Sequence, residues 1–356
     1  MIQTAEQYEF LHKAAFVALV CMKTTVESCD IGERIKFLHT KTKSGLSNMQ
    51  KEFEAVCGLC QNVDDGHKES DVGDVYQNTS TAVKQQKDRN TKILPHKMYR
   101  AQLFKDTSNE SDYINAVLIS SFRKTRHQIL TQLPLPSTVV DFYRLVTQYG
   151  VSLAVAFDGD VQSQDYTIGN YFPVSTTEPL TCEPFVISTS EIKRDNILEE
   201  QKLTITKTSQ EKETHTMSHV KSSIKELDPR KLYQITQKIR SQASKFNGRV
   251  LFMCSDGAEW SGLASVLTLL LDRMDHDQRL TVPLVVGAIK SVRPEVISSL
   301  SQYEVLYKVL ERYHEVTSSY NNVGDVSIVP IIQTRESGPH EDSGNVYANN
   351  DVTTAV

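Results

Sequence analysis

The chain has 356 residues, a formal net charge of −5 and a sequence pI of about 6.1. Hydrophobic residues make up 39% of it and charged residues 23%, the proportions of a soluble globular protein. The acidic balance argues against a general nucleic-acid-binding face, and no apolar run reaches the roughly 18 residues that a membrane span needs.

The N-terminal quarter of the chain is predicted to contain two helices separated by polar segments. Residues 1–22 carry apolar side chains at helical spacing and are predicted to form one helix. Residues 23–48 are rich in Thr, Lys and Ser and are predicted to be a linker with a short helix around Ile35 to Leu38. Residues 49–59 are predicted to be helical again. The polar segment 61–86 is predicted to be a disordered insertion, with order resuming at Ile93.

The rest of the chain alternates between strand and helix patterns. Strands are predicted at Val151–Phe157, Phe185–Ser188, Leu203–Lys207 and Val250–Met253, and helices at Val139–Val146, Pro229–Phe246, Ser261–Met274, Pro283–Ser291 and Ser301–Tyr313. Strands interleaved with helices indicate an α/β domain around a central sheet. From Asn321 the chain is rich in Gly, Ser, Asp and Asn and is predicted to be a disordered tail.

The segment Arg249–Gly262, RVLFMCSDGAEWSG, is the most informative part of this pattern. Its apolar strand ends at Cys254, and a turn of small residues follows before the next helix begins. Such a turn directs backbone N–H groups toward one point, and the helix N-terminus adds positive potential there. We therefore expect Cys254 to have a lowered pKa and to be able to attack a bound anion as a thiolate.

The charges of the same loop contradict an anion site. No Arg or Lys lies between Cys254 and Gly262. The loop instead contains two acids, Asp256 and Glu259, and the bulky indole of Trp260. Without a guanidinium, the site lacks the bidentate hydrogen bonds that hold an oxyanion.

The loop resembles the signature loop of the protein-tyrosine phosphatases, HC(x)5R(S/T)G. The matching positions are Cys254, Ser255, Gly257, Ser261 and Gly262. Trp260 stands where that family has its invariant arginine, and Met253 stands where it has the preceding histidine. Asp256, Ala258 and Glu259 complete the loop.

Other strings of the family occur in the family's order. Asp112–Ala116 resembles DYINAS, Thr131–Pro136 resembles TQGPLP, Asp141–Arg144 resembles DFWR, Tyr171–Pro173 resembles YWP, and Arg293-Pro294 with Gln302-Tyr303 resembles RPxMVQTxxQY. The resemblance covers most of the chain. It implies the α/β phosphatase-like fold, a central twisted mixed sheet flanked by helices.

The N-terminus resembles the same family ending a second time, because Met1–His12 is similar to RPxMVQTxxQYxFxH. The resemblance therefore implies a receptor-type tandem phosphatase. Residues 1–22 would be the last helix of a first domain, residues 23–48 an interdomain linker, and residues 49–316 a second domain with the flexible insertion 61–86. Residues 317–356 would be a disordered tail. The chain would then be the intracellular, cytoplasmic part of a single-pass receptor, with no membrane insertion of its own.

The resemblance also assigns catalytic positions. Cys254 matches the nucleophile, whereas Trp260 replaces the arginine that clamps the phosphoryl oxygens. Family spacing puts the general-acid loop near His219-Val220-Lys221, so that Lys221 falls at the acid's place, and Asp228 is predicted to start a helix instead. Ser298 occupies the place of the water-positioning glutamine, and Asn90, within Asp88–Pro95, that of the tyrosine that stacks on the substrate ring.

We therefore expect a phosphatase-like domain that is catalytically dead or strongly impaired and acts as a regulatory or interaction module. One expected partner is a first phosphatase domain of the same or another chain. Two alternatives remain open. The first is an active tyrosine phosphatase working through a cysteinyl-phosphate. The second is redox sensing through Cys254, which Asp256 and Glu259 oppose by raising the thiol pKa. A purely structural interpretation is that Cys254 is a small buried residue and that Trp260 packs into the cleft left by the missing arginine.

The remaining motifs concern metals and partners. Cys57 and Cys60 form a lone CxxC, which we interpret as two thiols on a helix surface, and we expect no metal or cofactor. Tyr347 and Asn349 form a YxN string similar to a phosphotyrosine ligand of adaptor SH2 domains. Thr354 and Val356 match a class I PDZ ligand, provided that Val356 is the true C-terminus. Both motifs can equally be idle residues of a tail.

Overall fold

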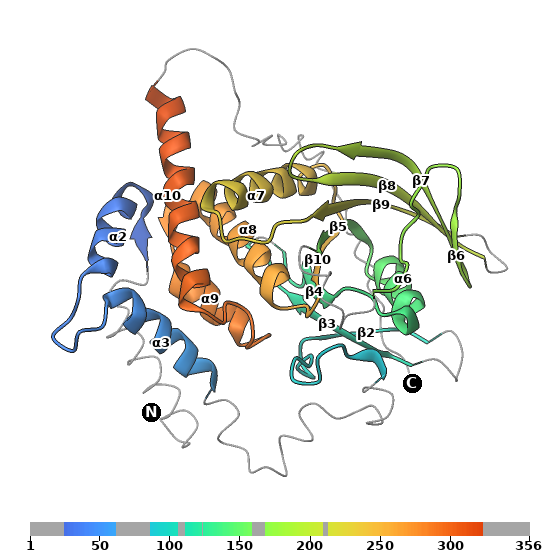
Figure 1. Ribbon diagram of the computed structural model, residues 1–356, viewed down its shortest axis with the longest axis horizontal. Coiled ribbons are helices and arrows are strands. Elements are labelled where there is room, and N and C mark those ends of the chain that lie inside the picture. Colours follow the sequence, from blue (N-terminus) through green and yellow to red (C-terminus); the bar gives the residue numbers. More distant parts are fainter. Residues whose placement is uncertain are drawn as a thin grey trace, which may run out of the picture. The chain divides into compact units, whose positions relative to one another are not determined.

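The computed structural model describes residues 25–61, 86–105, 111–122, 124–158, 168–208 and 213–322. Within these ranges the chain forms a nine-stranded sheet with strand order β2-β3-β4-β10-β5-β9-β8-β7-β6 and a two-stranded sheet that pairs β1 with β11. Helix α6 covers one face of the large sheet, and α7 and α8 cover the other (Figure 1). This mixed sheet flanked by helices confirms the predicted fold class.

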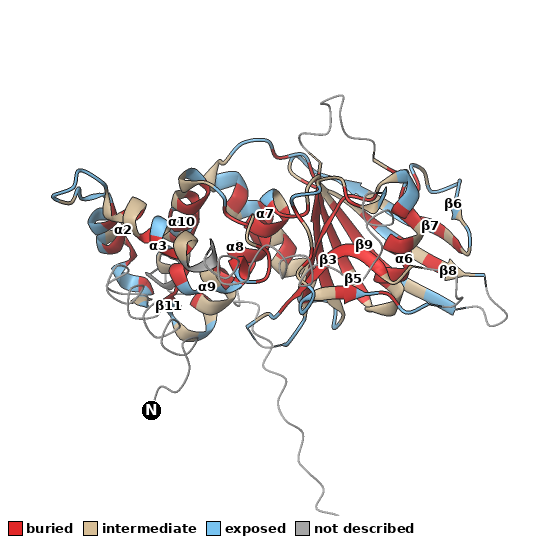
Figure 2. Cartoon of the chain, turned by 90° about the horizontal axis from the view of Figure 1, so that it is seen from below, coloured by how far each residue is buried: buried red, intermediate tan, exposed pale blue. Residues whose placement is uncertain are grey.

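The four central strands of the large sheet run parallel. They are β4 (Gln128–Gln132), β10 (Arg249–Cys254), β5 (Val151–Phe157) and β9 (Glu213–Ser222). Antiparallel strands flank them. On one side lie β3 (Tyr113–Ile119) and β2 (Arg100–Gln102), and on the other β8 (Glu199–Lys207), β7 (Phe185–Arg194) and β6 (Leu180–Cys182). The centre of this sheet is buried (Figure 2).

Strand β10 explains why a continuous apolar run forms the middle of the sheet. Val250, Phe252 and Cys254 face the core on the α8 side, whereas Leu251 and Met253 face the core on the α6 side. A central parallel strand is buried on both faces, so its polar–apolar alternation disappears. The alternation of side chains also fixes the thiol of Cys254 on the face that α8 covers.

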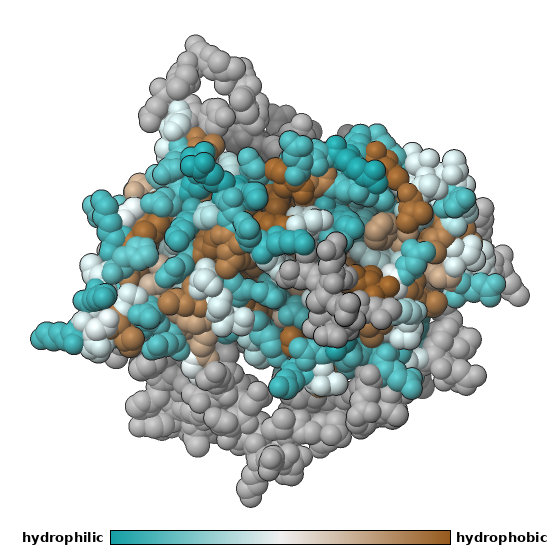
Figure 3. All heavy atoms as spheres, in the orientation of Figure 1, coloured by the Kyte–Doolittle hydropathy of each residue, from teal (hydrophilic) through white to brown (hydrophobic). Residues whose placement is uncertain are grey.

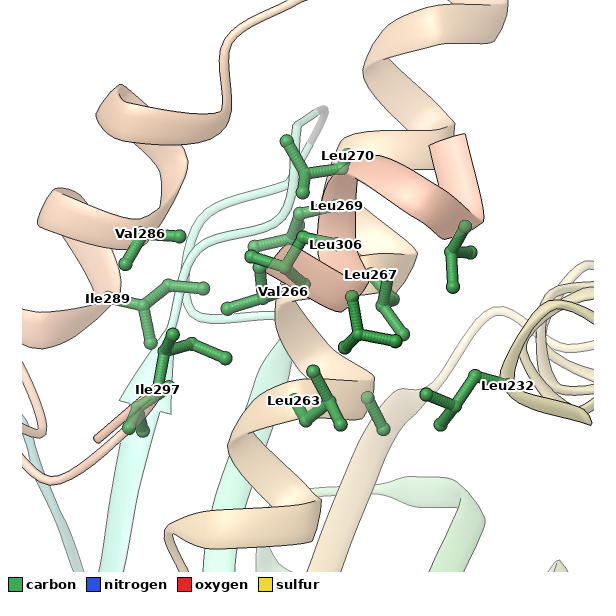
Figure 4. Close-up of a cluster of buried hydrophobic side chains, with 14 of the residues drawn as sticks. Leu232, Leu263, Val266, Leu267, Leu269, Leu270, Val286, Ile289, Ile297 and Leu306 are labelled. Carbon is green, nitrogen blue, oxygen red and sulfur yellow. The ribbon is translucent and has the colours of Figure 1, made fainter. Parts of the chain in front are cut away.

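The helices have the following bounds: α2 Ile31–His39, α3 Asn48–Gln61, α6 Val139–Gln148, α7 Pro229–Ala243, α8 Glu259–Asp277, α9 Val282–Lys290 and α10 Leu300–Asn322. Two short 3-10 turns precede α2 and α6, at Ser28–Asp30 and Pro136–Thr138. Leu263, Val266 and Leu267 of α8 lie in one apolar cluster with side chains of α9 and α10 (Figure 4). Burial of this cluster therefore holds the helix that follows the cysteine loop.

The segment predicted as a linker is more structured than expected. Helix α2 is longer than the predicted turn around Ile35, and β1 (Val26–Glu27) pairs with β11 (Arg279–Leu280). The backbone N–H of Ser28 also donates to the Gln278 carbonyl at 2.8 Å. Arg34 lies on the buried face of this helix, and because it is charged, the sequence does not show that face as an apolar stripe. The role of the segment between two domains stays a prediction.

Several strands were missed or predicted too short. β2, β3, β4, β6 and β9 were not predicted, and β7 and β8 extend well beyond the segments that alternate clearly. β3 and β4 are buried along their whole length, polar residues included, so that their sequences show no period of two. At the other end of the chain, α10 continues to Asn322, whereas the tail was predicted to begin at residue 317.

Three predictions lie outside the described residues. They are the helix 1–22, nearly all of the insertion 61–86, and the tail beyond Asn322 with Tyr347, Asn349, Thr354 and Val356. Among the described helices, none is both long and apolar enough to cross a membrane. The view of Figure 3 shows hydrophilic and apolar side chains interspersed over the surface.

Candidate functional site

Cys254 is the last residue of β10, at the edge where the parallel strands end. Its side chain is 2% exposed, and its carbonyl accepts a hydrogen bond of 2.7 Å from the backbone N–H of Leu133. Five residues later, helix α8 begins at Glu259. The predicted strand, tight loop and helix are therefore all present, with the thiol at their junction.

Two glycines allow this loop to approach its neighbours. Gly257 has φ +72°, and a Cβ there would lie 2.6 Å from the backbone nitrogen of Gln132. A Cβ at Gly262 would lie 2.6 Å from the side chain of Val296. Both positions therefore require glycine, the first also because its backbone is left-handed. They keep the loop against β4 and the first turn of α8 against residue 296.

The carboxylate of Asp256 occupies two of the backbone hydrogen-bond donors of the loop. Its Oδ1 accepts from the backbone N–H groups of Ala258 at 2.9 Å and Glu259 at 3.0 Å. These are the N–H groups at the start of α8, where an incoming oxyanion would bind. The thiol of Cys254 donates to the same oxygen at 3.0 Å. The loop thus holds an internal anion in direct contact with the sulfur.

This environment raises the pKa of the Cys254 thiol to about 12. Burial is the largest cause, and the charge of Asp256 is the next. The hydroxyl of Ser261, 3.2 Å from the sulfur, acts in the opposite direction but is outweighed. The expectation that the helix N-terminus would lower the pKa of this thiol is therefore wrong, and the sulfur is protonated at neutral pH.

Trp260 contributes packing at the position where the resemblance implies a guanidinium. Its side chain is half-buried and lies against the main apolar core. The neighbouring Glu259 is exposed, and its carboxylate accepts from Gln302 Nε2 at 3.4 Å. The first turn of α8 therefore presents an indole and an acid beside the loop.

Three of the family-like strings, around residues 88, 113 and 293, are joined by hydrogen bonds near the loop. Asp88 accepts from the hydroxyl of Tyr113 at 2.7 Å and from Nδ2 of Asn115 at 2.9 Å. The Oδ1 of Asn115 accepts from both terminal nitrogens of Arg293 at 2.9 Å. Arg293 is fully buried, and its burial lowers the pKa of its guanidinium. This network fixes the cation in place behind the loop.

A second arginine braces the loop from the side of β4. Arg89 Nη1 donates to the carbonyl of Ser255 at 2.6 Å and to that of Leu133 at 2.8 Å, and its backbone N–H donates to Gln132 Oε1 at 3.0 Å. These contacts orient carbonyls of the loop and of the segment after β4. Arg89 and Arg293 lie within strings that resemble the family, but their contacts were not predicted, because a single arginine carries no local signal of what it will contact.

The predicted place of the general acid is wrong. His219 and Lys221 lie inside β9, paired with Ala154 and Ala156 of β5, and the ammonium of Lys221 forms an ion pair of 2.6 Å with Asp158. A strand residue held by a ladder on both sides cannot belong to a mobile loop. The loop after β9 is residues 223–227, which contains the exposed Glu226. Asp228 starts α7, as predicted, and accepts from the Arg230 N–H at 2.8 Å.

The two other positions assigned by resemblance make local backbone contacts. Asn90 Oδ1 accepts from the Lys92 N–H at 3.0 Å, and the N–H of Ser298 donates to Gln302 Oε1 at 2.9 Å. The role of Asp256 had a signal in the sequence, since Asp two or three residues before a helix start often accepts its free N–H groups. Within the described residues, no group of three or more His, Cys, Asp or Glu side chains could hold a metal ion.

Comparison with known proteins bears on this geometry. Residues 84–312 match the family described as "Protein-tyrosine phosphatase". Over 322 residues the chain is 26% identical to "Receptor-type tyrosine-protein phosphatase zeta" of Rattus norvegicus, covering 87% of this chain and 13% of that protein.

Two further relatives give the same picture. The chain is 24% identical over 323 residues to "Receptor-type tyrosine-protein phosphatase U" of Gallus gallus, covering 88% of this chain and 22% of the relative. It is 23% identical over 334 residues to "Receptor-type tyrosine-protein phosphatase alpha" of Homo sapiens, covering 90% and 40%. The chain therefore spans less than half the length of each of these three relatives.

Proposed function

Because this chain belongs to the protein-tyrosine phosphatase family and is related to its receptor-type members, we propose that it has lost phosphoryl transfer and serves as a regulatory or interaction module in tyrosine-phosphorylation signalling. The contact of the Asp256 carboxylate with the N–H groups at the start of α8 and with the thiol carries the proposal. Trp260, where the family has its arginine, supports it.

A phosphate dianion would meet two obstacles at this loop. It would have to displace Asp256 from its hydrogen bonds, and like charges repel at contact distance. It would also meet a neutral sulfur, because a pKa of about 12 leaves only about 10⁻⁵ of the thiol ionised at pH 7. Loss of one oxyanion donor alone costs about 10²–10³ in rate. These effects do not add strictly, but each acts against turnover.

The first prediction concerns activity. We expect the purified chain to hydrolyse a phosphotyrosine peptide no faster than its Cys254→Ser variant, because neither an anion clamp nor a thiolate is present. Vanadate, which mimics the transferring phosphoryl group, is expected to show no saturable binding. The measurements are phosphate release under single-turnover conditions and titration calorimetry. Hydrolysis that Cys254→Ser abolishes would establish the active phosphatase instead.

The raised pKa also weighs against redox sensing. Thiolate character governs the rate at which a cysteine reacts with peroxide, and burial adds to the barrier. Cys254 is both buried and protonated at neutral pH. We therefore interpret the retained cysteine as a packing residue that closes the end of β10.

We further propose that this domain is the second of a tandem pair on the intracellular side of a receptor. The support is the N-terminal string Met1–His12, similar to the ending that Arg293-Pro294 begins, and the receptor-type names of the relatives. Its expected partner is the other phosphatase domain. Sequencing the upstream coding region tests the idea, since it requires a membrane span followed by an intact HC(x)5R domain.

The second prediction concerns Tyr347. When phosphorylated, this tyrosine is expected to bind an adaptor SH2 domain, because Asn349 at the second position after it favours the turn that such pockets accept. A pulldown with phosphorylated and plain peptides of residues 340–356 measures the difference. Equal recovery from the two peptides would refute the idea. The same peptides, with a free or an amidated terminus, test Thr354 and Val356 as a PDZ ligand.

A further inference from the structure

A cavity lies beyond the C-terminal end of α7, on the α7-facing side of strands β7, β8 and β9. Its volume is about 190 Å³. Its walls are formed by Glu191, Lys193, Glu200, Lys202, Thr216, Met217, Ser218, Gln242, Lys245 and Phe246. None of these residues belongs to the cysteine loop. The volume gives room for about six water molecules, so that any ligand is smaller than a drug-sized molecule.

The acids of this cavity already have partners. Glu191 forms an ion pair of 2.8 Å with Lys193. Glu200 accepts from the hydroxyl of Ser218 at 3.0 Å through one oxygen and from Nε2 of Gln242 at 2.8 Å through the other. Glu191 is therefore paired with a cation, whereas Glu200 keeps its charge but has both oxygens occupied by neutral donors.

Two lysines of the cavity keep their charge available. Among the described residues, no carboxylate lies within ion-pair distance of Lys202 or Lys245. Lys245 donates at 3.0 Å to the neutral Oε1 of Gln242, and Lys202 is exposed. Both lysines line the same cavity. With the charges of Glu191 and Lys193 paired, Lys202 and Lys245 together outweigh the single charge of Glu200, so the potential of the lining favours an anion.

An aromatic ring completes the lining. Phe246 is 38% exposed, whereas the phenylalanines of the core, such as Phe185 and Phe252, are buried. A ligand with a flat apolar body would cover part of this exposed ring and gain the hydrophobic and ring-stacking contributions together.

We propose that this cavity binds a small aromatic carboxylate. The carboxylate contacts the ammonium groups of Lys202 and Lys245, and the aromatic ring of the ligand lies against Phe246. The site is independent of the cysteine loop, so it stands whether or not the chain has phosphatase activity.

The test uses the full chain and 4-fluorophenylacetate, with binding followed by the ¹⁹F NMR line width of the probe. We expect saturable broadening with a dissociation constant in the millimolar range, roughly what a ligand of this size reaches. Lys202→Gln and Phe246→Ala are each expected to weaken binding at least about fivefold, since each removes one of the three side chains proposed to contact the ligand. Lys231→Gln, an exposed lysine of α7 outside the cavity, is the matched control and is expected to bind as the wild type does.

Two further measurements make the outcome decisive. 4-Fluorobenzyl alcohol, which lacks the carboxylate, is expected to bind at least about tenfold more weakly. Thermal unfolding checks that each variant is folded, and Phe246→Leu replaces Phe246→Ala if the latter is not. Absence of saturable binding to the wild type, equal binding of the alcohol, or unchanged binding by either cavity variant would overturn the proposal.

Discussion

At the scale of the residue, Asp256 connects the stability of the loop with its chemistry. Its carboxylate accepts from two N–H groups at the start of α8, a contact of the kind that stabilises helices by about 0.5–2 kcal/mol. The same oxygen accepts a hydrogen bond from the Cys254 thiol, and its charge helps to keep the sulfur protonated. The Asp256 carboxylate thus stabilises the loop while it occupies the position that a substrate anion would need. This is expected where the stability of the fold is retained and catalysis is not.

The third prediction follows from that contact. Asp256→Ala is expected to lower the pKa of Cys254 by about 2 units, because the charge and hydrogen bond of the carboxylate disappear while burial remains. The measurement is the alkylation rate of Cys254 against pH, followed by mass spectrometry of its peptide. Glu259→Ala removes an acid one turn away that does not contact the sulfur, and it is expected to leave the profile in place. An unchanged midpoint in Asp256→Ala would show that burial alone sets the pKa.

At the scale of the element, one buried carboxylate joins three helices. Glu52 of α3 pairs with Arg34 of α2 and accepts from the hydroxyls of Tyr303 at 2.8 Å and Tyr307 at 2.5 Å, both on α10. Burial is the largest influence on Glu52 and raises its pKa, while Arg34 acts against that shift. We take the carboxyl to be ionised, since a guanidinium and two hydroxyls donate to it. The contact attaches α2 and α3 to α10.

The fourth prediction tests this attachment. Glu52→Gln is expected to reduce the free energy of unfolding by about 3–5 kcal/mol, because it breaks the buried ion pair between Glu52 and the guanidinium of Arg34. Chemical denaturation of the two proteins gives the difference. The matched control is Glu54→Gln, on the exposed side of the same helix, with an expected change below about 0.5 kcal/mol. A small effect for both variants would mean that water reaches Arg34 and replaces the carboxylate.

At the scale of the whole molecule, the large sheet encloses a histidine that cannot easily take up a proton. His219 of β9 is buried beside the rings of Tyr171 and Phe172, with ring centroids 5.8 and 4.8 Å away. Burial, followed by the charge of Lys221, lowers the pKa of His219 to about 4, whereas Glu199 acts in the opposite direction. Above pH 6.5 the imidazole is neutral in both the folded and the unfolded chain. Below that pH the unfolded chain takes up the proton first, so the folded state loses stability until about pH 4.

The fifth prediction measures this loss. Between pH 7 and pH 5 the wild type is expected to lose about 2 kcal/mol more unfolding free energy than His219→Phe. The unfolded histidine takes up its proton below pH 6.5 and the folded one does not, so each of the 1.5 pH units down to pH 5 removes about 1.4 kcal/mol from the wild type only. Urea unfolding at the two pH values gives the numbers. His39→Gln changes an exposed histidine and is expected to behave as the wild type. Parallel curves for the wild type and His219→Phe would mean that the buried imidazole is protonated in the folded state.

The sequence alone determined the features that depend on neighbours along the chain. The apolar run before Cys254, the small residues after it and the apolar helix that follows predict strand, loop and helix, because backbone propensity and periodicity are local. The motifs around Tyr113, Asn115 and Arg293 identified the family, which the comparison confirms. The sequence also showed directly that no Arg or Lys lies from Cys254 to Gly262.

The tertiary structure alone decided which groups meet across the chain. That Asp88, Asn115 and Arg293 form one network, and that His219 and Lys221 lie in a strand, depends on pairing between segments tens to hundreds of residues apart. The hydrogen bond from the Cys254 thiol to Asp256 spans only two residues, but the burial of this pair depends on the same packing. Burial of whole strands removes the polar–apolar alternation that would reveal them, and a thiol pKa depends on the surroundings that those pairings create. A local pattern therefore indicated a nucleophile at Cys254, and only the packing around it showed a neutral sulfur.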